Sequence, residues 1–197
     1  MRTPSGITLL EMLVALALGI LGLLIAFPAF AYIRDGGRAA AGARQMAATF
    51  GALRWKSVSL RNARGLLFER QPNGWVWWEV EDGNGNDLRT SEVRSGVDPI
   101  RSGPHRLEDR VEHVTLGFPS ISAIPQIPPK PGTIPDLGDP VQFGRSDLIS
   151  FTPGGSCSSG TLYVTDGRSG LYGVVLYGPT AKVRVWRYDA RVGRWTL

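Results

Sequence analysis

The hydrophobic pattern begins with a long apolar run. Between residues 7 and 32 the only charged residue is Glu11. About 24 helical residues rise about 36 Å, more than the roughly 30 Å of a bilayer's hydrocarbon core. The pattern predicts a membrane-spanning helix over residues 7–32. Pro28 removes a backbone hydrogen bond from this helix and predicts a kink or a local melt there.

The carboxylate of Glu11 is costly in such a run. A charged side chain at the centre of a bilayer costs on the order of 2 to 3 kcal/mol, and less near the interface. In one interpretation Glu11 reaches the interface, because it lies one turn from the polar residues 1–6. In the other, cleavage between Gly6 and Ile7 creates an amine four residues from Glu11. Amine and carboxylate on neighbouring subunits then neutralise each other.

The pattern becomes amphipathic after residue 32. Ala43, Met46, Phe50 and Leu53 repeat at i, i+3, i+7 and i+10, which is the spacing of one helix face. We expect the helix to continue over residues 33–64, with this apolar stripe packed on a sheet. The basic residues beside the stripe are interpreted as an ordinary solvated face.

Short apolar segments separated by Gly and Pro follow the helix. Segments 65–71 and 75–81 flank Asn73-Gly74, which is a hairpin turn signal. Further strands are predicted at 111–118, 148–152, 161–166, 171–177 and 182–188. A helix followed by mostly antiparallel strands indicates the α+β class, with a β-rich domain over residues 65–197.

A proline-rich segment interrupts the strands over residues 119–140. The stretch between Phe118 and Phe143 holds seven of the 14 prolines. Proline cannot donate to a strand ladder, so an extended, exposed loop with polyproline character is expected. Disorder or decoration is favoured over a peptide-recognition site, although the segment is the best candidate for contact with a partner.

Length and composition allow one domain with a core in addition to the anchor, because the chain has 197 residues. The net charge of +5 is modest, but the two ends of the part after the apolar run are basic and its middle is acidic. Cys157 is the single cysteine, which excludes an internal disulfide.

An acidic loop follows the first hairpin. Asp82, Asn84 and Asn86 have the one-three-five spacing of a calcium loop, but Asp87 replaces the required glycine and Val93 replaces the bidentate glutamate. These three residues are therefore a weak calcium candidate, and a solvated turn is favoured.

The last long strand is a candidate nucleic-acid surface. If Val183 and Val185 point inward, the alternation of a strand places the other side chains on one outer face. Cations interleaved with aromatics suit phosphate contact and base stacking. In the alternative interpretation the charges protect a sheet edge. The candidate DNA-binding residues are Lys182, Arg184, Trp186 and Tyr188, with Arg191 and Arg194 in the hairpin that follows.

Motifs for catalysis are missing from the sequence. His105 and His113 lie near acidic residues, but no further Cys or His completes a metal site. A nucleophile elbow, a phosphate loop and a zinc helix motif are also missing. The chain is predicted to be no enzyme, with no cofactor, no bound metal and no small-molecule substrate.

Two parts of the sequence resemble known proteins. The stretch "GITLLE" from Gly6 to Glu11, followed by an apolar helix with Pro28, resembles the class III signal of type IV pilins and type II secretion pseudopilins. Residues 149–189, with a Phe-x-Pro-x-Gly turn, a Gly-Thr-Leu strand start and a Val-rich strand, resemble the GspH/FimT family of minor pseudopilins.

This resemblance implies a fold, a processing of the N-terminus and a set of partners. It implies a type IV pilin-like fold in which a long N-terminal helix, membrane-spanning in its first half, packs on a mostly antiparallel sheet. Residues 1–6 would be a leader that a prepilin peptidase removes, with N-methylation of Ile7, and Glu11 and Pro28 would serve assembly. The expected location is a bacterial inner membrane, single-pass, with a periplasmic domain, and then the filament.

The function expected from the resemblance is that of a minor subunit. It would join other pilins or pseudopilins in a type II secretion pseudopilus or a type IV pilus. One alternative is a FimT-like minor pilin that binds DNA for uptake. Another is a monomeric binding domain tethered to the membrane.

Overall fold

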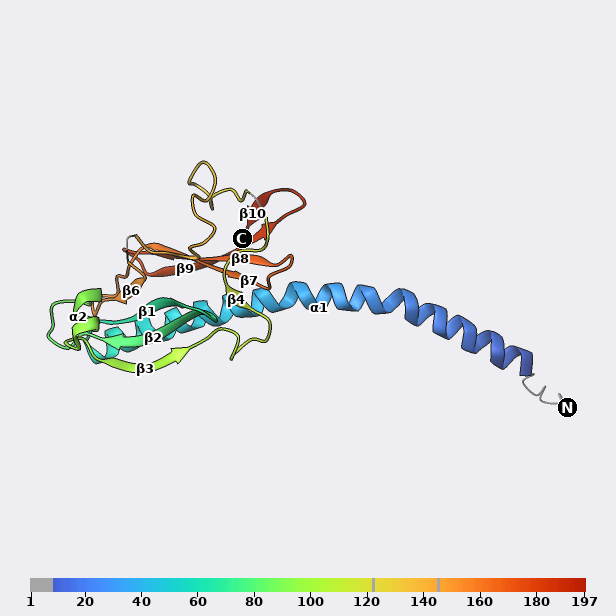
Figure 1. Cartoon of the computed structure of the whole chain (residues 1–197), viewed down its shortest axis with the longest axis horizontal. Coiled ribbons are helices and arrows are strands. Elements are labelled where there is room, and N and C mark those ends of the chain that lie inside the picture. Colours follow the sequence, from blue (N-terminus) through green and yellow to red (C-terminus); the bar gives the residue numbers. More distant parts are fainter. Residues whose placement is uncertain (1–8, 122, 145) are drawn as a thin grey trace.

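A long N-terminal helix and two antiparallel sheets make up the fold (Figure 1). The structure is a computed structural model that describes residues 9–121, 123–144 and 146–197, with the backbone alone over 24–36. Its helices are α1 (Leu9–Leu60) and α2 (Thr90–Ser95). The strands are β1 (Arg64–Gln71), β2 (Gly74–Glu81), β3 (Ile100–His105), β4 (Thr115–Leu116), β5 (Val141–Gln142), β6 (Leu148–Phe151), β7 (Gly160–Thr165), β8 (Leu171–Tyr177), β9 (Lys182–Asp189) and β10 (Arg194–Thr196).

The strands pair into two sheets. Sheet A has the order β3-β2-β1-β6, and sheet B has the order β10-β9-β8-β7-β4, with β5 also paired to β7. All of these pairings are antiparallel. In sheet B, Leu162, Val174 and Val185 lie side by side in register on the face toward α1. The alternate residues of these strands therefore form an outer face, which points away from the helix.

The second half of α1 supplies a stripe that both sheets cover. Ala43, Met46, Phe50 and Leu53 are all buried, as the helical spacing predicts. They share one core with residues of both sheets: Leu66, Phe68 and Trp77 of sheet A, and Leu162, Val164, Val174 and Leu176 of sheet B. Figure 1 shows this half of α1 lying along the two sheets.

The C-terminal end of α1 is anchored by several hydrogen bonds. Arg61 takes a left-handed conformation (φ 51°), and the Asn62 amide donates to the Ser57 carbonyl at 3.2 Å, which closes the helix. The buried Ser57 hydroxyl donates to the Thr152 carbonyl at 2.9 Å. Lys56 pairs with Glu79 of β2 at 2.7 Å. The helix end is thus held to sheet A and to the segment after β6.

Close approach between α1 and sheet B requires a glycine. A Cβ atom added to Gly42 would lie 2.5 Å from Cγ1 of Val114 and 3.2 Å from Cγ1 of Val164. A Cβ added to Gly51, on the exposed side of the same helix, would meet nothing within 4 Å. The lack of a side chain at Gly42 therefore allows the helix to lie close to β7.

The predicted fold class is wrong in its description of the helix, whereas the predicted mostly antiparallel, sheet-rich domain agrees with the structure. A membrane span needs roughly 20 consecutive apolar residues in a helix. Among the described residues no helix is both long enough and apolar enough to cross a membrane. This finding also contradicts the predicted single-pass location in an inner membrane. In addition, the apolar stripe packs against two sheets and not against one.

Several predicted strands match, and others differ. The segments predicted at 65–71, 75–81, 148–152, 161–166, 171–177 and 182–188 correspond to β1, β2, β6, β7, β8 and β9 within one residue. The segment predicted at 111–118 is a strand only over Thr115–Leu116 (β4), because turns occupy residues before it. The sequence pattern missed α2, β3 and β5, which have no clear apolar alternation.

Leucine at position 42 is expected to disrupt the contact between helix and sheet. Gly42→Leu should lower the free energy of unfolding by about 1 to 3 kcal/mol, because the side chain must displace Val114. The matched substitution Gly51→Leu should raise it by about 0.5 to 1 kcal/mol, because glycine is a poor helix former. Denaturant unfolding followed by tryptophan fluorescence measures both. Equal effects at the two positions would contradict the packing described for α1.

Candidate functional site

The first part of α1 is an apolar arm that the domain does not cover. We define the apolar arm as residues 9–23, all of which are exposed. Leu9 is 81% exposed and Leu23 is 70% exposed. Its other large apolar residues are Leu10, Met12, Leu13, Val14, Leu16, Leu18, Ile20 and Leu21. Figure 1 shows this part of α1 extending away from the sheets.

The predicted assembly residues fall in or near this arm. Glu11 is exposed on the first turn of α1, among the leucines. Pro28 lies within α1, beyond the arm. The predicted processing residues Gly6 and Ile7 lie outside the described residues. A continuous apolar surface of this size on a folded protein marks a site of interaction.

The outer face of sheet B carries the predicted DNA-binding residues. Lys182, Arg184, Trp186 and Tyr188 alternate with Val183 and Val185 along β9, and the two valines pack toward α1 as predicted. The four alternate residues therefore share the outer face. They do not share one environment, however. Lys182 is exposed, Arg184 and Trp186 are both half-buried, and Tyr188 is buried.

The proline-rich segment covers part of this outer face. Three isoleucines of the segment are buried against aromatic residues of sheet B, and the indole Nε1 of Trp195 donates to the Pro125 carbonyl at 2.7 Å. The segment is a loop with many exposed residues, as predicted, but its isoleucines are buried, which the sequence analysis did not predict. The buried residues of this outer cluster are Ile124, Ile127, Ile134, Tyr163, Leu171, Tyr188 and Trp195.

Aromatic contacts hold the outer cluster together. The ring centroids of Tyr188 and Trp195 are 5.2 Å apart, and those of Phe118 and Tyr163 are 4.6 Å apart. Such tilted pairs add to the free energy gained from burial. Burial also raises the pKa of the Tyr163 hydroxyl to about 12, so this group stays neutral at all physiological pH values.

The cations of this region lie outside the outer cluster. The Arg184 guanidinium lies over the Tyr177 ring, 5.7 Å from its centroid. Arg191 lies between β9 and β10, where its amide donates to the Asp189 carboxylate, and Arg194 begins β10. These cations can contact phosphate groups. The Tyr188 ring cannot stack on a base, because it is buried in the outer cluster with its centroid 5.2 Å from that of Trp195.

The weak calcium candidate forms a hydrogen-bonded turn between β2 and α2. Asp82 is buried, and one of its oxygens accepts the amides of Asn84 at 3.0 Å and Gly85 at 2.7 Å. Its other oxygen accepts the Asp87 amide at 3.0 Å. The side chains of Asn84 and Asn86 donate to Glu92. Backbone amides thus take the place that a cation would have at Asp82.

Other candidate chemical groups lie apart from one another. His105 lies 3.1 Å from the Ser102 hydroxyl, and His113 lies 3.4 Å from the Glu112 carboxylate. In the part of the chain that the structure describes, no three His, Cys, Asp or Glu residues are arranged to hold a metal ion. Burial raises the pKa of the Cys157 thiol to about 11, so this thiol is protonated and a poor nucleophile.

One signal in the sequence could have shown that the proline-rich segment packs on sheet B. Ile121, Ile124 and Ile127 are spaced three residues apart within the proline-rich stretch. Polyproline II has three residues per turn, so this spacing places the three side chains on one side. An apolar face on an extended segment indicates packing on a sheet and argues against disorder.

Comparisons with known protein families, with curated proteins and with solved structures find no match for this chain.

Truncation of Tyr188 should affect the stability of the domain. Tyr188→Ala is expected to lower the free energy of unfolding by about 3 kcal/mol, because it leaves a cavity beside Trp195 and Leu171. The matched control is Arg184→Ala, four residues earlier on the outer face of the same strand. It should lower the free energy of unfolding by less than about 1 kcal/mol. Thermal unfolding measures both. Similar small losses would mean that Tyr188 is a surface residue.

The turn around Asp82 should be stable without a metal ion. Asp82→Ala is expected to lower the free energy of unfolding by about 2 kcal/mol, because the backbone amides of Asn84, Gly85 and Asp87 lose their charged acceptor. Glu108→Ala, at an exposed acid elsewhere, should change it by less than about 0.5 kcal/mol. The unchanged chain should melt at one temperature with calcium and with a chelator. A higher melting temperature in calcium would contradict this interpretation of the turn.

Proposed function

We propose that the chain is a minor pilin-like subunit that assembles into a type IV pilus or a type II secretion pseudopilus through its apolar arm. In this proposal a prepilin peptidase first cleaves between Gly6 and Ile7. The arm itself is the observation that carries the proposal. It presents ten large apolar side chains in 15 residues, and the domain's own core lies elsewhere on the same helix.

Burial of the arm against other subunits would stabilise an assembly strongly. A fully buried Leu or Ile side chain contributes about 1.5 to 3 kcal/mol. The apolar residues lie all around the arm, as residues 12–14 and 20–21 show. A helix that is hydrophobic on every side is suited to be enclosed by several neighbours. This arrangement supports a helical bundle or filament more than a pair of subunits.

Glu11 would determine how the arms align. A carboxylate that becomes buried between apolar helices must be paired with a cation, because an unpaired buried charge is strongly destabilising. The new amine of Ile7 in a neighbouring subunit is such a cation. One register of the arms then brings amine and carboxylate together, and other registers leave both without a partner.

DNA capture through the outer face of sheet B is supported less well. Lys182 and Arg184 are available for phosphate contact, but the aromatic residues that would stack on bases lie in the outer cluster. DNA capture is therefore the less well supported of the two functions.

Glu11→Val should impair incorporation without affecting the domain. The valine keeps the arm apolar but removes the group that pairs with the amine of a neighbour. We expect the amount of the chain that co-purifies with other pilin-like subunits to fall at least several-fold. Quantitative mass spectrometry of the purified assembly measures this amount, and it identifies the mature N-terminus in the same sample.

The control is Glu69→Val, which removes an exposed carboxylate from β1 and should leave incorporation unchanged. Equal incorporation of the Glu11 variant and the unchanged chain would refute the role of Glu11. A native chain that keeps residues 1–6 and brings down no pilin-like subunit would refute the proposed function.

A further inference from the structure

The second half of α1 has a face that neither sheet covers. The free face, as we define it, consists of five exposed residues: Arg44, Ala48, Gly51, Ala52 and Trp55. On the other side of the helix, a Cβ atom added to Gly42 would contact Val114. At about 100° per residue, Arg44, Gly51 and Trp55 lie about 180° to 220° around the helix from Gly42. The free face therefore points away from the core.

Trp55 gives the free face an apolar anchor. Among the described residues outside the apolar arm it is the most exposed large apolar side chain, at 73%, and Val58 beside it is 47% exposed. A tryptophan side chain buries roughly 150 to 250 Å² in a contact, and tryptophan is enriched among the residues that dominate interfaces. A Cβ atom added to Gly51 would meet nothing within 4 Å, so a second surface can approach the helix closely beside the ring.

The charge on this side of the helix is positive. Residues 36–60 contain no Asp or Glu. Lys56 is paired with Glu79. Arg44 and Arg54 are exposed, and they form no ion pair with the residues that the structure describes. A surface that covers the free face must therefore supply carboxylates, because a cation that loses its water without gaining a partner is destabilising.

The turn between β3 and β4 carries such carboxylates. Glu108, Asp109 and Glu112 are all exposed, and in the described part of the chain Glu108 and Asp109 form no ion pair. The guanidinium of Arg110, which lies among them in the sequence, is placed over the Trp77 ring, 5.6 Å from its centroid. The turn at residues 108–112 therefore presents negative charge to the solvent.

The 108–112 turn and the free face lie on opposite sides of α1. Leu107 and Val114 flank the turn and are the side chains nearest to Gly42, with an added Cβ atom 3.4 Å from Cδ2 of Leu107. Figure 1 shows the segment between β3 and β4 beside α1, at the end of the domain from which the helix extends. The turn therefore cannot reach the free face of its own chain, but it can reach that of a neighbour.

Parallel neighbouring helices bring the two surfaces together. The turn lies at the level of Gly42, and the middle of the free face lies about seven residues further along the helix. A displacement of about 10 Å along the helix axis therefore centres the turn of one copy over Ala48 and Gly51 of the next. Two free faces would not bind each other, because both carry arginines and neither carries a carboxylate.

We propose that the free face of α1 binds the 108–112 turn of a second copy of this chain. Arg44 and Arg54 pair with the carboxylates of the turn, and the Trp55 ring packs on the turn between them. The two surfaces differ and the copies are displaced along the axis, so the contact builds an open row and not a closed pair. This inference rests on the proposed function, because it assumes neighbouring subunits with parallel helices, and it names one of those neighbours.

Mixing two charge-reversed variants tests the contact. Sedimentation velocity of the full chain, in a mild detergent that covers the apolar arm and at low ionic strength, measures self-association. Arg44→Glu and Asp109→Lys should each weaken self-association about ten-fold, because like charges then face each other. An equimolar mixture of the two variants should associate as strongly as the unchanged chain, because the unchanged turn of the first variant meets the unchanged free face of the second.

Three further variants complete the experiment. Trp55→Ala should weaken self-association several-fold without lowering the melting temperature, because this ring is exposed. Glu69→Lys reverses an exposed carboxylate on β1 and should leave self-association unchanged. Glu11→Val should also leave self-association in detergent unchanged, since the contact does not involve the apolar arm. A Glu11 variant that incorporates normally would thus refute the role of Glu11 in assembly without touching this contact.

Several results would overturn the proposal. They are an unchanged chain that does not self-associate, single variants that associate as strongly as the unchanged chain, and a mixture that does not recover. An equal loss in the Glu69 variant would mean that net charge and not this contact is responsible. Binding of single-stranded DNA that Arg44→Glu abolishes, without any self-association, would identify the free face as a phosphate surface instead.

Discussion

The burial of one helix stripe between two sheets is the interaction on which the rest of the structure depends. Met46, Phe50 and Leu53 contact residues of sheet A and of sheet B in one core. Within the described residues neither sheet has a second large helix to cover it, because α2 has only six residues. The free energy of folding therefore comes largely from this shared stripe, and the sheets are placed relative to each other by the helix.

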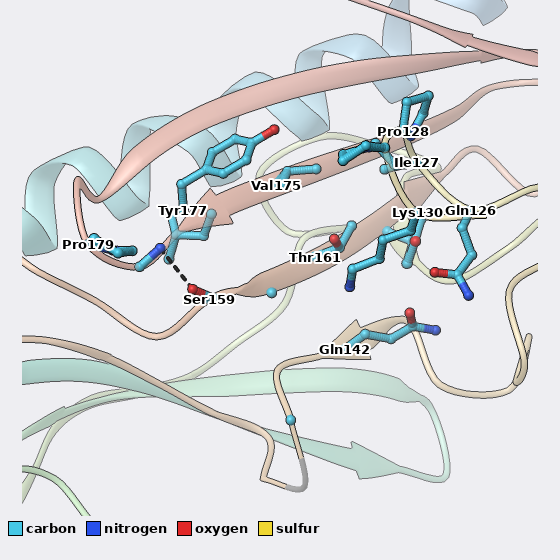
Figure 2. A pocket seen from close by; sticks show the side chains of 16 residues that line it. Gln126, Ile127, Pro128, Lys130, Gln142, Ser159, Thr161, Val175, Tyr177 and Pro179 are labelled. Atoms are coloured by element: carbon cyan, nitrogen blue, oxygen red, sulfur yellow. Dashed lines mark hydrogen bonds between the residues drawn. The ribbon is translucent and has the colours of Figure 1, made fainter.

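The same arrangement explains why sheet B has a second core. A sheet with a helix on one face exposes apolar side chains on the other unless something covers them. The proline-rich segment does so through its isoleucines, and it needs no strand ladder because the Trp195 indole binds its Pro125 carbonyl. Since the segment covers only part of the face, a pocket of about 300 Å³ remains between the segment and the strands β7 and β8 (Figure 2).

Much of the fold could be predicted from local pattern. The spacing of Ala43, Met46, Phe50 and Leu53 identified the buried helix face, and alternation in β9 identified which residues point outward. Local pattern could not show that Tyr188 is buried, because the outer cluster combines residues of sheet B with isoleucines more than 50 positions earlier in the chain. It also could not show that Lys130, Gln142 and Thr161 line one pocket, since no spacing links three segments that only the folded sheet makes neighbours. The membrane span was predicted from apolar composition alone, and the described part of α1 does not support it.

The continuity of α1 has a mechanical consequence. The apolar arm and the buried stripe belong to one helix from Leu9 to Leu60, which continues through Pro28 and Gly36-Gly37. Tension applied at the arm would therefore act along the helix axis and load the stripe in shear. The Ser57 and Lys56 contacts at the far end of the helix would bear the same load. Separating the domain from its helix would then require breaking the contacts of the whole core and not those of a single attachment point.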